Sequence, residues 1–443
     1  MADDDRLTGL LDAFAEILTN DPGPLDPTSP YYVPNLHGTN ADDVVQTLAR
    51  TLRRTQGSGM SYFSGQRGTG KSTELRRLTM LLNGAGNCRA LMVDALEYIG
   101  ESHLIELIDV LLVMAVAFAE KIREETGEEF LQEGVATRFS NWLQTEVEIG
   151  GFTVLGVKGE FRKQQQSVTA RIRAFDLGRR ERFVTDCQEF IRDMAAFVKK
   201  RYRVEKVVLI LDSLERLQGS RGTDNAMFGC IVQVFDIEMD ALRIPETQVI
   251  YSIPPYLPYL SNVRSRVGVC TLASVRVYEP PPKRRQLRRS GLDALARVVD
   301  KRFPAWRDVI TPQALDHLML ASGGDVRQLL RRLLLDTLDQ AYYALDRLPL
   351  ALDDEIIETV VKKHRIEFEQ MVVQEEYPLL KTIADGNTVD LPKRSDLPTA
   401  ARFFDIRAVL NYRNGVDWVD LNPLLWPLID AYQLPAAHAA SAA

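Results

Sequence analysis

The sequence predicts an α/β fold: a parallel sheet with a helical insertion, followed by a helical lid and a winged-helix domain. Two apolar, β-prone runs, at 207–211 and 248–253, have the composition of strands buried on both faces of a parallel sheet. A shorter run of this kind, at 60–63, leads directly into a glycine-rich turn and then a helical pattern. Because strands that alternate with helices imply a parallel sheet, the three runs together predict the α/β class.

The composition is typical of a folded protein. The 443 residues are 45% hydrophobic and 26% charged, which excludes disorder as the main state. The formal net charge of −7 argues against a protein whose whole surface binds polyanions. A local basic stripe could still contact nucleic acid. At about 150 residues per domain, the length suggests two or three domains.

The sequence favours a cytoplasmic location. Its four cysteines are far apart and form no CxxC pair, so neither a disulfide framework nor a zinc cluster is indicated. The acidic start, Met-Ala-Asp-Asp-Asp-Arg, is unlike a secretory signal. The longest apolar stretch, 110–119, is too short to cross about 30 Å of hydrocarbon, so it predicts a buried helix and no membrane partner.

Breaks in the pattern divide the chain into several parts. Residues 1–30 begin with a short amphipathic pattern that ends at Asp-Pro-Gly-Pro. Between residues 99 and 202, long helical patterns lie on either side of a β-branched patch at 149–157. The predicted parts are an amino-terminal helix and linker (1–30), an α/β core (31–280) with a helical insertion (100–205), a helical lid (281–350), a winged-helix-like domain (351–435) and a disordered tail (436–443).

The carboxyl-terminal third predicts helices followed by a hairpin. Thr311 before Pro312 has the form of a helix N-cap, and Gly323-Gly-Asp325 begins a further helix that extends to about residue 343. A long helix is expected at 353–380. Asn414-Gly415 then joins two alternating runs as a hairpin turn, and this order of elements suggests a winged helix.

The clearest chemical signal is a full GxxxxGK[ST] match between a predicted strand and a predicted helix, which is the context that supports a P-loop. In a P-loop the glycines let backbone amides close around the β-phosphate, Lys71 reaches the β and γ oxygens, and the Ser72 hydroxyl ligates Mg²⁺. The sequence therefore predicts binding of ATP and Mg²⁺. The expected binding residues are Gly65, Gln66, Arg67, Gly68, Thr69, Gly70, Lys71, Ser72 and Thr73.

A P-loop also needs a carboxylate at the end of a neighbouring strand, where it holds the metal through water. The run Val207-Val-Leu-Ile-Leu-Asp212 supplies that carboxylate, so Asp212 is the second expected metal ligand beside Ser72. It follows Lys71 by 212 − 71 = 141 residues, which is long for a minimal core. That separation is the reason for treating 100–205 as an insertion.

With these two motifs, three further features resemble the AAA+ and STAND branch of P-loop ATPases. Ser252 ends the next strand, where that family has a polar sensor-1 residue. The segment Gly324-Asp-Val-Arg327 is similar to the start of the sensor-2 helix in archaeal STAND-type ATPases and replication initiators, where the arginine contacts the γ-phosphate. The winged-helix pattern follows in the same order. This resemblance spans roughly 30–430 without the insertion, and implies catalytic roles for Ser252 and Arg327. An ordinary strand-end serine and a surface arginine are the alternatives.

The sequence departs from the family at the catalytic carboxylate. AAA+ enzymes usually have Asp-Glu here, whereas Asp212 is followed by Ser213. Glu215 resembles the Asp-x-x-acid arrangement of some STAND-like and KAP-like ATPases and could act as the catalytic base; a solvated helix glutamate is the alternative. Binding of ATP is therefore more firmly predicted than hydrolysis, which we expect to be slow.

The resemblance also implies two residues around the nucleotide. Arg264 and Arg266 follow the sensor-1 position at about the distance of an arginine finger supplied by a neighbouring subunit, and we select Arg266; ordinary surface charges are the alternative. Tyr32 in the Tyr31-Tyr32-Val33 segment is expected to flank the adenine, with a core or linker aromatic as the alternative. A finger acting in trans implies a homo-oligomer.

A nucleic-acid partner is possible but not favoured. The segment 280–302 has a local charge of +6, yet it lacks interleaved aromatic residues, so a solvated helix face or a subunit contact is the preferred interpretation. Residues 386–420 carry five basic residues and five aspartates, and zero net charge is poor for gripping phosphates. The five histidines show no metal-ligand spacing, so Mg²⁺ carried with the nucleotide is the only metal expected.

The main hypothesis is an ATPase that acts as a nucleotide-dependent switch, controlling its own assembly or an effector protein. Initiators, regulators and phage-defence ATPases share this layout. Two alternatives come from other classes. One is a DNA-binding protein that uses ATP as a structural ligand, and the other is a P-loop phosphotransferase, which would leave the winged-helix tail unexplained.

Overall fold

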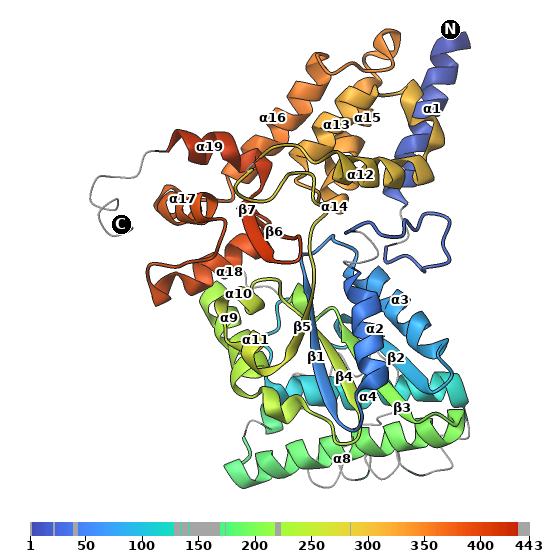
Figure 1. The fold of residues 1–443 in the computed structure, drawn as a ribbon, viewed down its shortest axis with the longest axis vertical. Coiled ribbons are helices and arrows are strands. Elements are labelled where there is room, and N and C mark those ends of the chain that lie inside the picture. The colour runs from blue at the N-terminus through green and yellow to red at the C-terminus, as the bar shows by residue number, and fades with distance from the viewer. Residues whose placement is uncertain are drawn as a thin grey trace. The chain divides into compact units, whose positions relative to one another are not determined.

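The computed structural model describes residues 2–20, 23–38, 43–127, 169–172, 174–217, 223–283 and 285–432, with 134 and 141 (Figure 1). The predicted tail at 436–443 and the β-branched patch at 149–157 lie outside these residues. The chain divides into two compact units. We call Val44–Ser64 with Glu74–Thr271 the sheet unit, and Met1–Asp43 with Gly65–Thr73 and Leu272–Ala443 the helical unit. The domain boundaries given above stay a prediction.

A five-stranded sheet forms the core of the sheet unit, which confirms the predicted α/β class. Its strands are β1 (Gly59–Gly65), β2 (Cys88–Asp94), β3 (Lys206–Asp212), β4 (Gln248–Ile253) and β5 (Gly268–Leu272). Their order in the sheet is β2-β3-β4-β1-β5, and the pairs β2/β3, β3/β4 and β4/β1 are parallel. All residues of β3 and β4 are buried, as expected for strands covered on both faces.

The strand order creates a topological switch point. The chain crosses from β1 to β2 in one direction and returns through β3 and β4 in the other. Because such crossovers are right-handed, the two directions place their helices on opposite faces of the sheet. The carboxyl end of β1, beside β4, is therefore the topological switch point, where open α/β sheets bind ligands. Tyr251 pairs with both Leu211 and Tyr62, so β3, β4 and β1 end at the same edge.

Long helices connect these strands. Helix α4 packs on β2, while α8 packs on β2, β3 and α4. The predicted buried helix at 110–119 is confirmed, since every side chain from Ile108 to Glu120 in α4 is buried. The described helices of the predicted insertion thus connect β2 to β3. The helices of this unit are α2 (Val44–Arg54), α3 (Lys71–Asn83), η2 (Ala95–Glu97), α4 (Leu107–Thr126), α8 (Leu177–Tyr202), η3 (Leu214–Arg216), α9 (Asp224–Val232), η4 (Gln233–Ile237), η5 (Met239–Leu242), α10 (Leu257–Leu260) and α11 (Val263–Arg266).

The helical unit contains a helical array and a small hairpin. Strands β6 (Val409–Arg413) and β7 (Asp417–Leu421) pair in antiparallel fashion, with α18 against β6 and α17 against β7. The helices are α1 (Ala2–Thr19), α12 (Arg289–Arg302), η6 (Pro304–Asp308), α13 (Pro312–Ala321), α14 (Val326–Gln328), η7 (Leu329–Leu334), α15 (Leu335–Ala341), η8 (Leu345–Arg347), α16 (Glu355–Glu369), η9 (Gln374–Glu376), α17 (Tyr377–Gly386), η10 (Arg394–Asp396), α18 (Leu397–Asp405), η11 (Pro423–Leu425) and α19 (Trp426–Ala431).

Most of the predicted elements here are confirmed. The Thr311 hydroxyl caps α13 by accepting from the Ala314 amide, and the predicted hairpin has Gly415 in its turn at φ +91°. The single helix predicted at 353–380 is wrong, because α16 ends at Glu369 and α17 begins at Tyr377. Pro378 lies in the first turn of α17, where its missing N–H costs nothing, and it would have broken a continuous helix.

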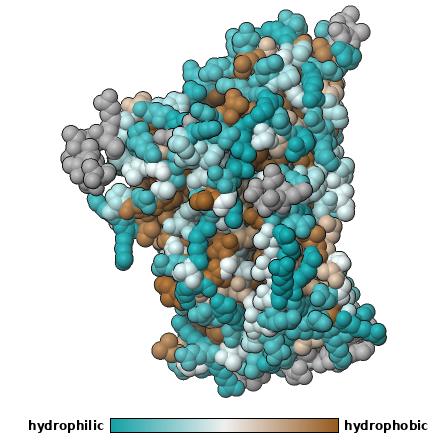
Figure 2. Space-filling model, in the orientation of Figure 1, coloured by the Kyte–Doolittle hydropathy of each residue, from teal (hydrophilic) through white to brown (hydrophobic). Residues whose placement is uncertain are grey.

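The face of the molecule seen in Figure 2 is mostly hydrophilic, with apolar residues in small groups. Among the helices of the described ranges, none has the length and apolar character needed to span a bilayer.

Candidate functional site

The glycine-rich loop follows β1 at the switch point and ends in the first turn of α3. Gly68 and Gly70 have φ values of +99° and +88°, in the left-handed region that favours glycine. A Cβ at Gly65 would lie 2.5 Å from the Leu272 carbonyl oxygen, so another chain segment approaches too closely for a side chain. A Cβ at Gly70 would meet nothing within 4 Å. Gly65 therefore allows close packing at the start of the loop, and the positive φ values of Gly68 and Gly70 allow the tight turn that follows.

Hydrogen bonds inside the loop converge on one carbonyl. The Lys71 ammonium and the Thr69 hydroxyl each donate to the Gln66 oxygen at 2.8 Å. The Thr69 amide donates to the same oxygen at 3.3 Å. At the other end of the loop, the Thr73 hydroxyl accepts from the Leu25 amide at 3.0 Å. Lys71 is buried, so its charge is held inside the loop whose amides would surround a phosphate.

The structure brings the sensor-2 candidate against this loop. A Cβ at Gly68 would lie 2.9 Å from Arg327 Cβ and 2.9 Å from the Asp325 Oδ1 atom. Burial lowers the pKa of Arg327, and the nearby guanidinium groups of Arg67, Arg407 and Arg331 lower it further. The Asp325 carboxylate acts in the opposite direction and raises it. Positive charge is thus concentrated beside the loop, as a polyphosphate site requires.

Sequence reasoning missed Arg407 as a member of this group. It lies between α18 and β6, and its guanidinium pairs with the buried Asp325 carboxylate at 3.2 Å. Asp325 also caps α14 by accepting from the Gln328 amide. No local pattern marks Arg407, because its neighbourhood depends on how the hairpin packs.

The carboxylate edge lies in the sheet unit, at the ends of β2, β3 and β4. Asp212 is the last residue of β3 and is only 2% exposed. Ser213 follows with a φ of +70°, and the short helix η3 then carries the buried Glu215. The Ser252 hydroxyl, at the end of β4, accepts a 2.9 Å hydrogen bond from the Leu214 amide. Ser252 therefore fixes the turn that orients Glu215.

A further carboxylate at this edge, Asp94, was not predicted. It ends β2 and is paired in register with Asp212. Burial raises the pKa of Asp94. Hydrogen bonds from the Leu96 amide and from Ser213, together with the positive charge of Arg216, lower it by a smaller amount. The run Ala90-Leu-Met-Val-Asp94 has the same form as the run before Asp212, so an apolar strand ending in Asp was the available signal.

Taken one at a time, the two expected metal ligands, Ser72 of the helical unit and Asp212 of the sheet unit, are of types that Mg²⁺ binds. Mg²⁺ prefers carboxylate and hydroxyl oxygens and commonly takes one or two carboxylates together with substrate phosphates. Ser72 offers a hydroxyl in the first turn of α3, and Asp212 offers a carboxylate at the end of β3. Within the described ranges, no group of three or more His, Cys, Asp or Glu side chains forms a metal site on its own.

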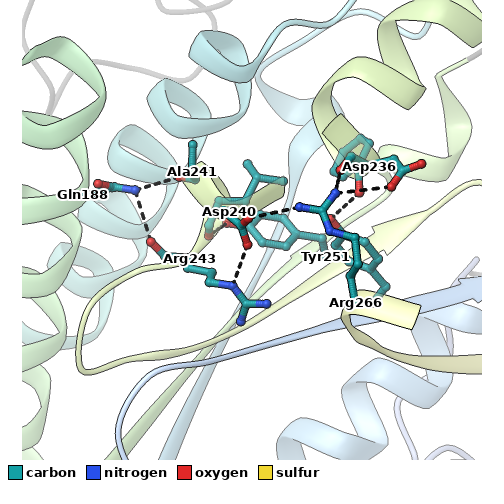
Figure 3. Close-up of polar contacts among 10 residues, drawn as sticks. Gln188, Asp236, Asp240, Ala241, Arg243, Tyr251 and Arg266 are labelled. Carbon is teal, nitrogen blue, oxygen red and sulfur yellow. Dashed lines mark hydrogen bonds and ion pairs between the residues drawn. The ribbon is translucent and has the colours of Figure 1, made fainter. Parts of the chain in front are cut away.

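Arg266 is paired with carboxylates of its own chain. Its guanidinium lies 3.0 Å from Asp240 Oδ2 and 3.5 Å from Asp236 Oδ1, and it donates to the Asp236 carbonyl (Figure 3). The side chain remains 37% exposed. Arg264 donates to the Pro258 carbonyl at 3.0 Å. The role of Arg266 as an arginine finger stays a prediction. In that role, its guanidinium would have to leave Asp236 and Asp240 and bind a phosphate of the neighbouring subunit's nucleotide.

The Tyr32 side chain is half-buried, and its amide donates to the Ser29 carbonyl at 3.0 Å. The neighbouring Tyr31 ring lies 5.8 Å from the Arg302 guanidinium. The adenine-flanking role of Tyr32 stays a prediction.

Three arginines of the basic segment at 280–302 form ion pairs within the chain. Arg285 pairs with Asp430, Arg288 with Glu279, and Arg289 with Asp293 and Asp316. Arg302 is buried. Whether this segment binds nucleic acid stays a prediction.

The fold and the site define a chain of the α/β class that carries a P-loop motif at the switch point of a parallel sheet. No model of a known protein family matches it, and no curated protein matches it either. Solved structures with a similar fold include the Orc2 protein of Aeropyrum pernix in its ADPNP and ADP complexes, at 13% identity over 93% of this chain and 97% of that chain, with a TM-score of 0.37. The ADP form of that protein matches at 13% identity over 94% and 96%, with a TM-score of 0.36. Cdc6p from Pyrobaculum aerophilum matches at 13% identity over 92% and 98%, with a TM-score of 0.32. The likeness is loose, and the function below is argued from the residues of this chain.

Proposed function

We propose that this protein is a cytoplasmic ATPase that binds ATP with Mg²⁺, hydrolyses it slowly and uses the nucleotide state as a switch. The observation that carries the proposal is the glycine-rich loop itself. It has a buried lysine, two glycines at positive φ and an arginine from α14 packed against Gly68. Amides in this arrangement bind phosphate, and the two cations would bind the β and γ oxygens.

Each residue has a proposed task. Lys71 would bind the β and γ oxygens while the Gln66 carbonyl positions its ammonium group, and Arg327 would bind the γ-phosphate. Ser72 and Asp212 would hold Mg²⁺, which neutralises charge on the phosphates. Glu215 would orient a water molecule and accept its proton while the water oxygen bonds to the γ-phosphorus and ADP leaves. Ser252 supports this step by holding the turn that carries Glu215.

The switch would act through the γ-phosphate. While it is present, Arg327 and Lys71 share a ligand, and this ties α14 to the loop. After cleavage that link is lost, so the helices and hairpin of the helical unit are freer to rearrange. We propose that this change controls the assembly of a homo-oligomer or the activity of an effector protein. A switch of this kind would suit a role in phage defence or signalling.

The test is an ATP-binding and phosphate-release assay combined with sizing, on the wild type and Lys71→Ala. We expect Lys71→Ala to lower turnover at least about 100-fold, because it removes a cation from the transition state. Lys199→Ala is the matched control, since the Lys199 ammonium also donates to a main-chain carbonyl, that of Glu246, at the surface of the sheet unit. A wild-type protein that ignores ATP would refute the proposal.

The proposed finger is tested by mixing subunits. Arg266→Ala alone should be inactive, and adding Lys71→Ala subunits should restore part of the phosphate release, because each variant supplies what the other lacks. Absence of rescue, with both variants folded, would assign Arg266 to its contacts with Asp236 and Asp240 only.

A further inference from the structure

The Gln66 side chain is engaged by the carboxyl-terminal hairpin, although Gln66 belongs to the phosphate-binding loop. It is 1% exposed, and its amide nitrogen donates to the Val409 carbonyl at the start of β6. The Ser274 hydroxyl lies 3.4 Å from its amide oxygen, and the Ser274 amide donates to the Asn411 carbonyl of the same strand. Both ends of the Gln66 amide therefore face groups associated with β6.

The main chain of the same residue organises the loop. The Gln66 carbonyl accepts from the Thr69 amide, the Thr69 hydroxyl and the Lys71 ammonium. A side chain fixed at Val409 restricts the rotation of the residue that bears this carbonyl. The hairpin thus orders the acceptor that positions Lys71, even though 343 residues separate Gln66 from Val409.

Two further contacts attach the hairpin beside the loop. Arg407, two residues before β6, pairs with Asp325, whose Oδ1 atom would lie 2.9 Å from a Cβ at Gly68. The Tyr412 hydroxyl donates to the Gly323 carbonyl at 2.7 Å, in the turn that leads to Arg327. The hairpin is therefore linked both to the loop and to the start of α14.

We propose that Gln66 is a positioning residue through which the β6–β7 hairpin raises the affinity of the loop for the triphosphate, and that nucleotide binding stabilises the hairpin in return. The inference rests on the proposed function, because it needs ATP to bind at this loop. A loop ordered before binding loses less conformational entropy when the phosphate arrives, which favours binding. Thermodynamic linkage then requires the same coupling in the opposite direction.

The decisive variant is Gln66→Met, which keeps the length of the side chain but removes its hydrogen-bonding amide. We expect the dissociation constant for a fluorescent ATP analogue to rise about fivefold, the usual effect of one lost hydrogen bond. Gln188→Met is the matched control. Its side-chain amide also donates to main-chain carbonyls, those of Ala241 and Arg243, but in the sheet unit (Figure 3). This control should bind the analogue like the wild type.

Hydrogen exchange of the amides at 409–421 provides the second readout. ATP should slow exchange there in the wild type and in Gln188→Met, and the slowing should be lost in Gln66→Met at saturating ATP. Unchanged affinity and unchanged slowing in Gln66→Met would overturn the inference, as would faster exchange in the wild type with ATP. A wild type that does not bind ATP is a different result, because it refutes the proposed function before any variant is needed.

A variant in the hairpin tests the same coupling without altering the loop. Tyr412→Phe removes only the hydroxyl that bonds the Gly323 carbonyl. We expect faster exchange at 409–421 and an ATP affinity lowered about fivefold. Faster exchange with wild-type affinity would show that the loop does not depend on the hairpin, and would overturn the inference.

Discussion

The glycine-rich loop and the carboxylate edge are held by different parts of the chain. Gln66 is fixed by Val409, 343 residues away in sequence, and Gly68 is packed against Asp325 and Arg327. The carboxylate edge is fixed by strand register and by local hydrogen bonds such as that between Leu214 and Ser252, 38 residues apart. Nucleotide binding should therefore respond to changes in the helical unit, whereas catalysis should respond to changes within the sheet.

The largest effect that would separate the two regions is expected at Glu215. Glu215→Gln should lower the rate of phosphate release about 100- to 10,000-fold, because an amide cannot accept the proton. ATP affinity should stay within a few-fold of the wild type. Both are measured by phosphate release and equilibrium binding, with the exposed Glu181→Gln as control. Full turnover in Glu215→Gln would assign this carboxylate a structural role.

Two glycine substitutions at similar positive φ should separate the cost of a steric clash from the cost of the backbone conformation. Gly324→Ala would place a Cβ 1.8 Å from the Val275 carbonyl oxygen at a φ of +85°, so the free energy of unfolding should fall by about 3 kcal/mol or more. Gly70→Ala meets no atom within 4 Å, and its φ of +88° should cost only about 1–2 kcal/mol. Thermal unfolding measures both. Equal losses of stability would contradict this assignment.

At the carboxylate edge, Ser252→Ala should lower turnover about fivefold without altering ATP affinity. The substitution removes the acceptor of the Leu214 amide, which is worth about 1 kcal/mol and holds the Glu215 turn. Ser252→Thr should restore most of the rate, because it returns the hydroxyl. A variant that loses ATP affinity instead would place Ser252 in direct contact with nucleotide.

The smallest effect concerns Asp94 and pH. Because burial raises the pKa of this carboxyl, the folded protein binds more protons than the unfolded chain between the ordinary and the raised value. The free energy of unfolding should therefore fall as pH rises through that window. Asp94→Asn should remove this dependence and stabilise the protein slightly at pH 7, while still capping η2. Urea unfolding at pH 4 and 7 tests it; lower stability of the variant at pH 7 would be the contrary result.

The sequence by itself determined the elements whose signals are local. The P-loop segment, the β3 and β4 runs, the capped helix at Thr311 and the Asn414-Gly415 hairpin all follow from patterns within about fifteen residues. Strand β2 was missed although it is as long as β3 and also ends in Asp, and β5 was missed because it has only five residues. One helix was predicted at 353–380 because the periodicity there was given more weight than Pro378. Local patterns report what a segment prefers when its neighbours are unknown.

Only the tertiary structure decided which residues meet. It paired Asp94 with Asp212, placed Arg407 beside Asp325, directed Arg266 to Asp236 and Asp240, and engaged Gln66 with the hairpin. These contacts depend on strand order and on packing between segments that are distant in sequence. Hydrophobic burial drives that packing without direction, so the partner of a polar side chain is known only once the surrounding elements have been positioned.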